Sequence, residues 1–142
     1  MQHSLSTQDQ LDIQYLLARA GSTLDDHALD ELGPLFAENA SFSLRIARGE
    51  LMGPFEGRTA IIDMMRSAVS AQTDQRRHVI SNIFLGPQRE DGAVEVTSNL
   101  TLLATESGEI QLLSAGVYHD RVIRTEAGWQ LLTRHLELDR PY

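Results

Sequence analysis

The 142-residue sequence contains no cysteine, which excludes disulfides, thiolate metal sites and a cysteine nucleophile. It is also poor in basic residues, with 12 Lys and Arg against 20 Asp and Glu and a formal net charge of −8. This acidic balance argues against nucleic-acid partners and anionic membrane surfaces, because clusters of Lys and Arg bind both. The densest basic run is Arg76-Arg77-His78.

Long hydrophobic runs are missing as well. No stretch of about 18 consecutive apolar residues, the length of a membrane-spanning helix, occurs in the sequence. The N-terminal residues Met1–Leu5 lack the basic segment followed by an apolar run that is typical of a signal peptide. We therefore expect a cytoplasmic protein.

What remains is an ordinary globular composition, with 42% hydrophobic and 23% charged residues. Those fractions are too apolar for a disordered chain. The length favours one domain over residues 1–142. A domain of this size buries roughly 68–70% of its unfolded surface, so it needs no metal or disulfide for stability.

The first third of the sequence has the periodicity of a helix. Thr7 and Gln10 have the spacing of a capping box, which satisfies open N–H groups at a helix start. Gly21 and Asp25 follow Leu17 at intervals of four, which places Asp25 near the buried edge of the helix, close to its end. The apolar stripe of the helix is Ile13, Leu16, Leu17, Ala20 and Leu24.

The rest of the chain divides into short helices and then strands. We expect a second helix over His27–Phe36, a strand over Ala40–Ile46, a loop around Gly53–Gly57 and a third helix over Thr59–Ala71. Four strands joined as sequential antiparallel hairpins follow: Arg77–Leu85, Ala93–Thr105, Glu109–Arg124 and Trp129–Leu138. Because helices come first and strands last, the predicted class is α+β. Long antiparallel strands curl, and a curled sheet closed by a few helices encloses a pocket.

Short motifs in a fixed order carry a family resemblance over nearly the whole chain. The motifs are Leu24-Asp25, Leu32-x-x-Leu35-Phe36-Ala37, Gly53-Pro54-Phe55-Glu56-Gly57-Arg58, Arg77-His78-Val79-Ile80-Ser81-Asn82, Gly116-Val117-Tyr118-His119-Asp120 and Gly128-Trp129. This order resembles the SnoaL-like branch of the nuclear transport factor 2-like superfamily. The resemblance implies a cone-shaped half-barrel, in which a strongly curved mixed or antiparallel sheet and about three helices from the N-terminal half surround a central pocket.

One group within that superfamily comprises scytalone dehydratase, bile acid dehydratase and hexachlorocyclohexane dehydrochlorinase. These enzymes use an Asp late in the first helix and a His that starts a strand, and Asp25 and His78 match those positions. The substrate-orienting tyrosines of scytalone dehydratase are not evident, because the first strand offers Phe42 and Leu44, and the pocket lysine of the dehydrochlorinase is replaced by Ala20. The resemblance thus implies the same acid–base pair acting on a different substrate.

A second similar group is the small (beta) subunit of aromatic-ring-hydroxylating dioxygenases. The sequence from Arg77 to Arg140 looks like that subunit, which is usually longer and serves mainly in assembly. A non-catalytic subunit or a ligand-binding module therefore remains the alternative function.

The chemistry expected of the pair is proton transfer without a metal or redox cofactor. Strand alternation would place His78, Ile80, Asn82 and Phe84 on one face. If that face lines the pocket, Asp25 accepts one imidazole N–H and fixes the tautomer, while the other ring nitrogen acts as general base. Elimination of water, isomerisation or intramolecular cyclisation of a mostly apolar cyclic molecule would fit. The plainer interpretation is a buried core histidine and a helix-ending aspartate.

Further ligand contacts are expected from Tyr118, which could donate a hydrogen bond, and from Asn82, which could orient a ligand. Core packing and a strand-edge hydrogen bond are their structural alternatives. The predicted contacts also include Gly21, Phe42 and Leu44.

The outer sheet face offers two further hypotheses. His119, His135 and Glu137 have residue types suited to a metal site, although solvated polar positions are the plainer interpretation. An apolar face with Val79, Ile83, Leu113, Val117, Leu132 and Leu136 predicts a homodimer or higher homo-oligomer.

Overall fold

The computed structural model describes residues 5–142, so most of the stretch Met1–Leu5, on which the signal-peptide prediction depends, lies outside the described residues. The helices are α1 (Thr7–Asp25), α2 (Leu29–Leu32), the 3-10 turn η1 (Gly33–Leu35) and α3 (Arg58–Ser70). The strands are β1 (Phe36–Ile46), β2 (Met52–Glu56), β3 (Gln75–Gln88), β4 (Val94–Glu106), β5 (Glu109–Thr125) and β6 (Gly128–Leu138). Within the described part of the chain, no helix is both long and apolar enough to cross a membrane.

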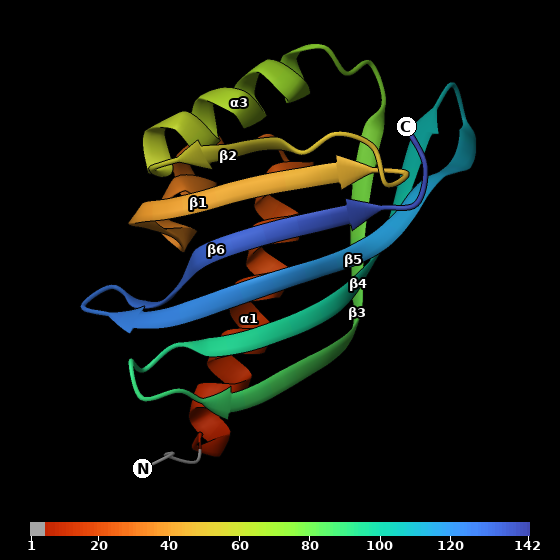
Figure 1. The fold of residues 1–142 in the computed structure, drawn as a ribbon. Helices are drawn as coiled ribbons and strands as arrows, with labels where there is room; N and C mark the ends of the chain where they lie inside the picture. The colour runs from red at the N-terminus through yellow and green to blue at the C-terminus, as the bar shows by residue number, and fades with distance from the viewer. Residues whose placement is uncertain (1–4) are drawn as a thin grey trace.

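The six strands form one open, curved sheet in the order β2-β1-β6-β5-β4-β3. Helix α1 crosses one face of this sheet, and α3 lies over the end that carries β1 and β2 (Figure 1). The predicted α+β class is confirmed. The predicted sequential antiparallel hairpins are confirmed for β3, β4, β5 and β6, and the sheet is mixed because β6 also pairs in parallel with β1. Local periodicity does not encode this pairing, which joins strands from opposite ends of the chain.

Three local predictions differ from the structure. The helix predicted over His27–Phe36 is a single turn followed by the 3-10 turn with Pro34, and Phe36 already starts β1. Proline ends the helix because it lacks the N–H that the next turn requires. The predicted loop around Gly53–Gly57 contains the edge strand β2, a position where a proline costs no ladder hydrogen bond.

The third difference is the start of α1. Ser6 is its N-cap, and the Ser6 side chain accepts a hydrogen bond from the backbone N–H of Asp9 at 3.0 Å. The capping box predicted for Thr7 and Gln10 is therefore replaced by a cap one residue earlier. Both arrangements satisfy an open N–H group of the first turn, so the helix itself is unaffected.

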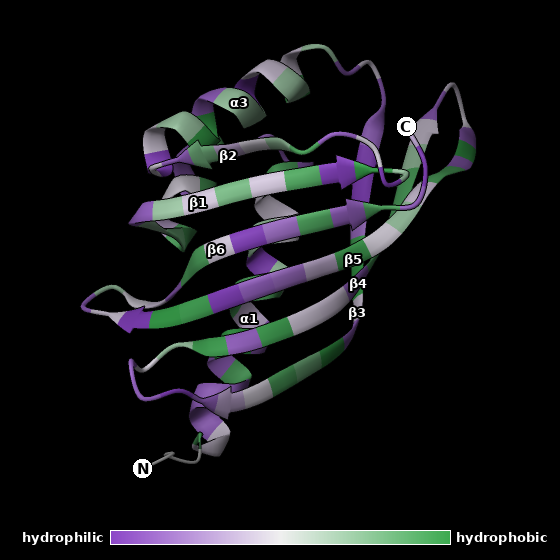
Figure 2. Ribbon diagram, viewed as in Figure 1, coloured by the Kyte–Doolittle hydropathy of each residue, from purple (hydrophilic) through white to green (hydrophobic). Residues whose placement is uncertain are grey.

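The core lies between α1 and the inner face of the sheet. Four residues of the predicted stripe are buried, with Ile13 and Leu17 fully inaccessible, and Leu24 at its end is half-buried. Along the strands, hydrophobic and hydrophilic residues alternate where one face turns inward and the other outward (Figure 2). The close pairing of β5 and β6 requires Gly116, because a Cβ there would collide with the backbone carbonyl of Glu137.

A bulge in β3 changes which side chains face inward. The register with β4 shifts between Ser81 and Phe84, and Asn82 adopts a positive φ of 52°. An extra residue in one strand reverses the alternation beyond it. Phe84 is consequently 70% exposed, and the prediction that it shares a face with His78 was wrong.

Candidate active site

A cavity lies between the inner face of the sheet and helices α1 and α3. About 100 Å³ of it is open to the centres of water molecules, and one water needs roughly 10–15 Å³ on this measure. The cavity therefore has room for several waters or a small ring compound. Its wall is mostly apolar. Of the residues predicted to contact a ligand, Gly21, Phe42, Leu44, His78 and Tyr118 line it, whereas Asn82 in the bulge does not.

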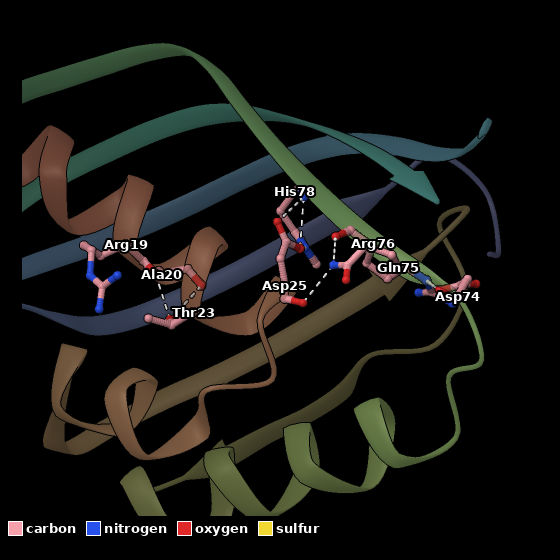
Figure 3. Close-up of polar contacts among 8 residues, drawn as sticks. All are labelled: Arg19, Ala20, Thr23, Asp25, Asp74, Gln75, Arg76 and His78. Carbon is pink, nitrogen blue, oxygen red and sulfur yellow. Dashed lines mark hydrogen bonds and ion pairs between the residues drawn. The ribbon is translucent and has the colours of Figure 1, made fainter. Parts of the chain in front are cut away.

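Asp25 and His78 meet at one side of this cavity. Asp25 is the last residue of α1, and His78 lies near the start of β3 (Figure 3). The Nδ1 atom of His78 lies 2.5 Å from Oδ1 of Asp25. The carboxylate also accepts the backbone N–H of His78, at 2.9 Å to Oδ2 and 3.1 Å to Oδ1. Two hydrogen bonds from one residue fix the carboxylate relative to the imidazole ring.

The orientation of this pair suits His78 as the group facing a ligand. His78 borders both the cavity and a groove on the protein surface, whereas Asp25 borders only the groove. Asp25 occupies Nδ1, and Nε2 has no hydrogen-bond partner anywhere in residues 5–142. The imidazole thus has one nitrogen held by the protein and one without a partner among the described residues.

Neighbouring residues hold the pair in place. The amide nitrogen of Gln75 donates a hydrogen bond to the backbone carbonyl of Asp25 at 3.0 Å (Figure 3). Gly21 packs α1 closely against β3, since a Cβ there would touch both Cβ and the carbonyl oxygen of His78 at 3.4 Å. The end of α1 and the start of β3 are therefore tied by backbone and side-chain contacts.

Arg134, which lines the cavity, belongs to a buried charged pair that the sequence did not predict. The Nε and Nη2 atoms of Arg134 donate to the two carboxylate oxygens of Asp120 at 2.9 and 3.1 Å. Their side chains are 5% and 0% exposed. The guanidinium carbon of Arg134 lies 3.8 Å from the centre of the Tyr118 ring, a cation–π geometry.

A signal for Arg134 was present in the sequence. Arg134, Leu136 and Leu138 alternate along β6, and all three are buried and line the cavity. The expectation that Leu136 faces the outer side of the sheet was wrong. Register irregularities in β6 near Leu131 move the inward face by one position.

Burial is the main cause of the pKa shifts of Asp120 and Tyr118. Burial raises the pKa of the Asp120 carboxyl, against the opposing effect of Arg134. Burial likewise raises the pKa of Tyr118 to about 12, although the Arg134 charge acts to lower it. The Tyr118 hydroxyl has no hydrogen-bond partner among the described residues. It is therefore a protonated donor at neutral pH, with its proton free for a ligand oxygen.

The shifted phenol predicts a loss of stability at alkaline pH. A folded-state pKa above the unfolded value of about 10 stabilises the protein below pH 10, and this contribution is lost as pH rises towards about 12. For a buried group, a shift of about two units corresponds to about 2–3 kcal/mol. We expect Tyr118→Phe to reduce the loss of unfolding free energy between pH 9 and pH 12. Urea denaturation across this range tests it, and an unchanged pH dependence would contradict the assignment.

The polar residues on the outer face form a separate cluster. The Ser43 hydroxyl and Nδ1 of His135 are 2.7 Å apart, and Nε2 of His135 lies 2.7 Å from Oε1 of Glu137. The hydrogen bond from His135 lowers the pKa of Glu137. Within residues 5–142, no three His, Asp or Glu side chains gather into a group that could hold a metal ion.

Comparisons with known proteins agree with this architecture. Residues 6–135 match the family model of the SnoaL-like domain. No curated protein matches the sequence. The fold is similar to that of Aln2 from a Streptomyces species, with 21% identity, 96% of this chain and 95% of the other covered, and a TM-score of 0.81.

Two further solved structures share the fold. A protein from Catenulispora acidiphila in complex with S-DNPA is 24% identical, with 92% of each chain covered and a TM-score of 0.78. A protein from Novosphingobium aromaticivorans, described as the beta subunit of a putative aromatic-ring-hydroxylating dioxygenase, is 23% identical. Its alignment covers 94% of this chain and 90% of the other, with a TM-score of 0.77. At these identities the likeness concerns the fold.

Proposed function

The chain belongs to the SnoaL-like family of the nuclear transport factor 2-like superfamily, and from this premise we propose that it is a small-molecule lyase or isomerase. In this proposal residues 1–142 form one domain whose cavity binds a mostly apolar cyclic substrate. His78 is the general base and Asp25 orients it. The observation that carries the proposal is the Asp25–His78 hydrogen bond at the wall of an apolar cavity.

The proposed reaction begins with removal of a proton from a substrate carbon by Nε2 of His78. The electron pair of the broken C–H bond forms a C=C bond or an enolate, and the imidazolium that results is stabilised by the Asp25 carboxylate. The imidazolium then returns the proton to the leaving hydroxyl in an elimination, or to a different carbon in an isomerisation. The side chains of His78 and Asp25 are only 12% and 9% exposed, and this low exposure strengthens the attraction between imidazolium and carboxylate.

Tyr118 has the second role in the proposal. Its protonated hydroxyl donates a hydrogen bond to the oxygen on which negative charge develops. Arg134 stacks on the Tyr118 ring, and its charge favours the same developing negative charge. The cavity wall also contains the apolar side chains of Phe42 and Leu44, and Gly21, which has no side chain. Such a wall supports a substrate with a ring rather than a polar chain. The structural neighbour solved in complex with S-DNPA supports ligand binding by this fold.

Hydrogen–deuterium exchange at carbon tests the proposal without knowledge of the bond that is finally broken. A panel of small cyclic ketones and hydroxy-ketones is incubated with the protein in D2O, and exchange is followed by NMR. We expect exchange next to the carbonyl of at least one compound that is lost in His78→Ala. Exchange at the same rate in wild type and His78→Ala would contradict the proposed base.

We also propose that two copies of the chain associate through the outer sheet face. Ile110 and Leu112 are 71% and 62% exposed there, close to Val79, which is 44% exposed. Large exposed apolar side chains on one face are typical of protein interfaces. Size-exclusion chromatography with light scattering should give the mass of two chains for wild type and of one chain for Leu112→Glu.

The control for this prediction is Tyr15→Glu, which changes an exposed aromatic residue on α1 and should leave the mass unchanged. A monomeric wild-type protein would contradict the homodimer. Co-purification with a larger iron–sulfur subunit would instead support the alternative function as a dioxygenase small subunit. The likeness to a protein described as a dioxygenase beta subunit is the observation behind that alternative.

A further inference from the structure

We propose that the mouth of this cavity is an anion-binding subsite built on Arg76, so that the substrate is a ring compound carrying a carboxylate. The inference rests on the proposed function and specifies its substrate class. The charged side chains of the cavity wall are all basic. Arg76 and Arg134 line the cavity, but among the described residues no Asp or Glu does, although the chain contains 20 acidic residues.

The two arginines differ in what they can still donate. Arg134 gives Nε and Nη2 to Asp120 and has one face against Tyr118. Arg76 gives only Nε to Asp74, at 2.7 Å, and its Nη1 and Nη2 atoms have no acceptor within residues 5–142. The two terminal nitrogens of the Arg76 guanidinium are therefore free to donate hydrogen bonds to a ligand.

Arg76 is also unlike the surface arginines of the chain. Its side chain is 13% exposed, compared with 50% for Arg89 and 67% for Arg124. A guanidinium that has lost most of its water and keeps two free nitrogens gains more from an anion than a hydrated one does. A carboxylate matches two such nitrogens with two parallel hydrogen bonds.

Two neighbouring side chains position the Arg76 guanidinium. Asp74 fixes Nε, and the ring of Tyr142, which also lines the cavity, lies 5.2 Å from the guanidinium carbon (Figure 3 shows Asp74 and Arg76 at the start of β3). Tyr142 is 55% exposed, so this end of the cavity meets solvent. A carboxylate held here keeps part of its hydration, which the apolar interior could not offer.

Arg76 also lies near His78. Arg76 and His78 are two residues apart on β3 and face the same cavity. In an extended strand such residues are about 7 Å apart. A carboxylate on Arg76 would therefore place a ring next to Nε2 of His78, with the reacting carbon across the ring from the acid-bearing side chain.

The test compares two ligands of nearly equal shape, naphthalene-2-acetate and naphthalene-2-acetamide, by isothermal titration calorimetry at pH 8. For wild type we expect the carboxylate to bind at least about 10-fold more tightly than the amide. In Arg76→Gln that ratio should fall to about one, with the affinity for the amide unchanged. The matched control is Arg77→Gln, because the Arg77 side chain is exposed outside the cavity, and it should keep the wild-type ratio.

Two further measurements separate this inference from the proposed function. The carboxylate preference of wild type should decrease as salt is raised, which needs no variant, and it should persist in His78→Ala. Equal affinity of wild type for both ligands, or binding of neither in the millimolar range, would overturn the anion subsite. Carbon–deuterium exchange that still depends on His78 would in that case leave the proposed function intact.

Discussion

His78→Ala is expected to lower catalysed proton exchange at carbon by about 10²–10⁴-fold, the usual contribution of a general base. The substitution removes Nε2 of His78, the ring nitrogen that Asp25 does not hold, from a residue that lines the cavity. The substitution also removes a mostly buried ring. The Asp25 carboxylate loses its contact with Nδ1 but keeps its hydrogen bond from the backbone N–H at position 78. Exchange rates in D2O under saturating substrate measure the effect, and circular dichroism verifies the fold.

Two companion variants make this result specific. Asp25→Asn keeps the side-chain shape but removes the charge that stabilises the imidazolium, so we expect a loss of the same order. His119→Gln changes an exposed histidine on the outer face and should retain the wild-type rate. Full activity in both His78→Ala and Asp25→Asn would leave no role for the pair.

The largest expected effect on stability comes from Asp120→Ala. This substitution leaves the Arg134 guanidinium buried without its carboxylate, since both side chains are almost inaccessible. Breaking a buried ion pair by removing one partner costs about 3–5 kcal/mol. That is a large share of the roughly 5–15 kcal/mol by which a domain is stable. Urea denaturation at pH 7 measures the loss of unfolding free energy.

Matched variants separate burial from charge pairing. Glu95→Ala breaks exposed ion pairs with Arg89 and Arg121 and should cost no more than about 1 kcal/mol. The double substitution Asp120→Leu with Arg134→Met should recover much of the loss, because apolar replacement of a buried pair is often neutral. If Asp120→Ala costs less than about 1 kcal/mol, the pair is hydrated in solution and the buried geometry is wrong.

Helical periodicity predicted the part of the site that depends on local structure. The stripe from Ile13 to Leu24 determines which side of α1 faces the sheet, and Asp25 follows from it at the end of the helix. The motif around His78 came from the family resemblance, and the structure brings the two side chains together. Spacing along the sequence could not supply this contact, because the residues are 53 positions apart.

The features that the sequence did not predict depend on pairing between strands that are distant in the chain. The parallel contact between β1 and β6 encloses the cavity wall that carries Arg134. The bulge at Asn82 reverses the faces of the second half of β3. Arg76 and Arg134 were overlooked because arginines are usually solvated, and only the three-dimensional structure shows which ones lie against a cavity.

The proposed chemistry requires that Asp25 holds Nδ1 of His78 and leaves Nε2 free for a ligand. Nitrogen-15 NMR of the His78 imidazole tests this most directly, recorded with the ring neutral in wild type and Asp25→Asn. We expect a protonated Nδ1 and a bare Nε2 in wild type, with the preference lost in Asp25→Asn. A wild-type ring protonated at Nε2, with Nδ1 bare, would contradict it.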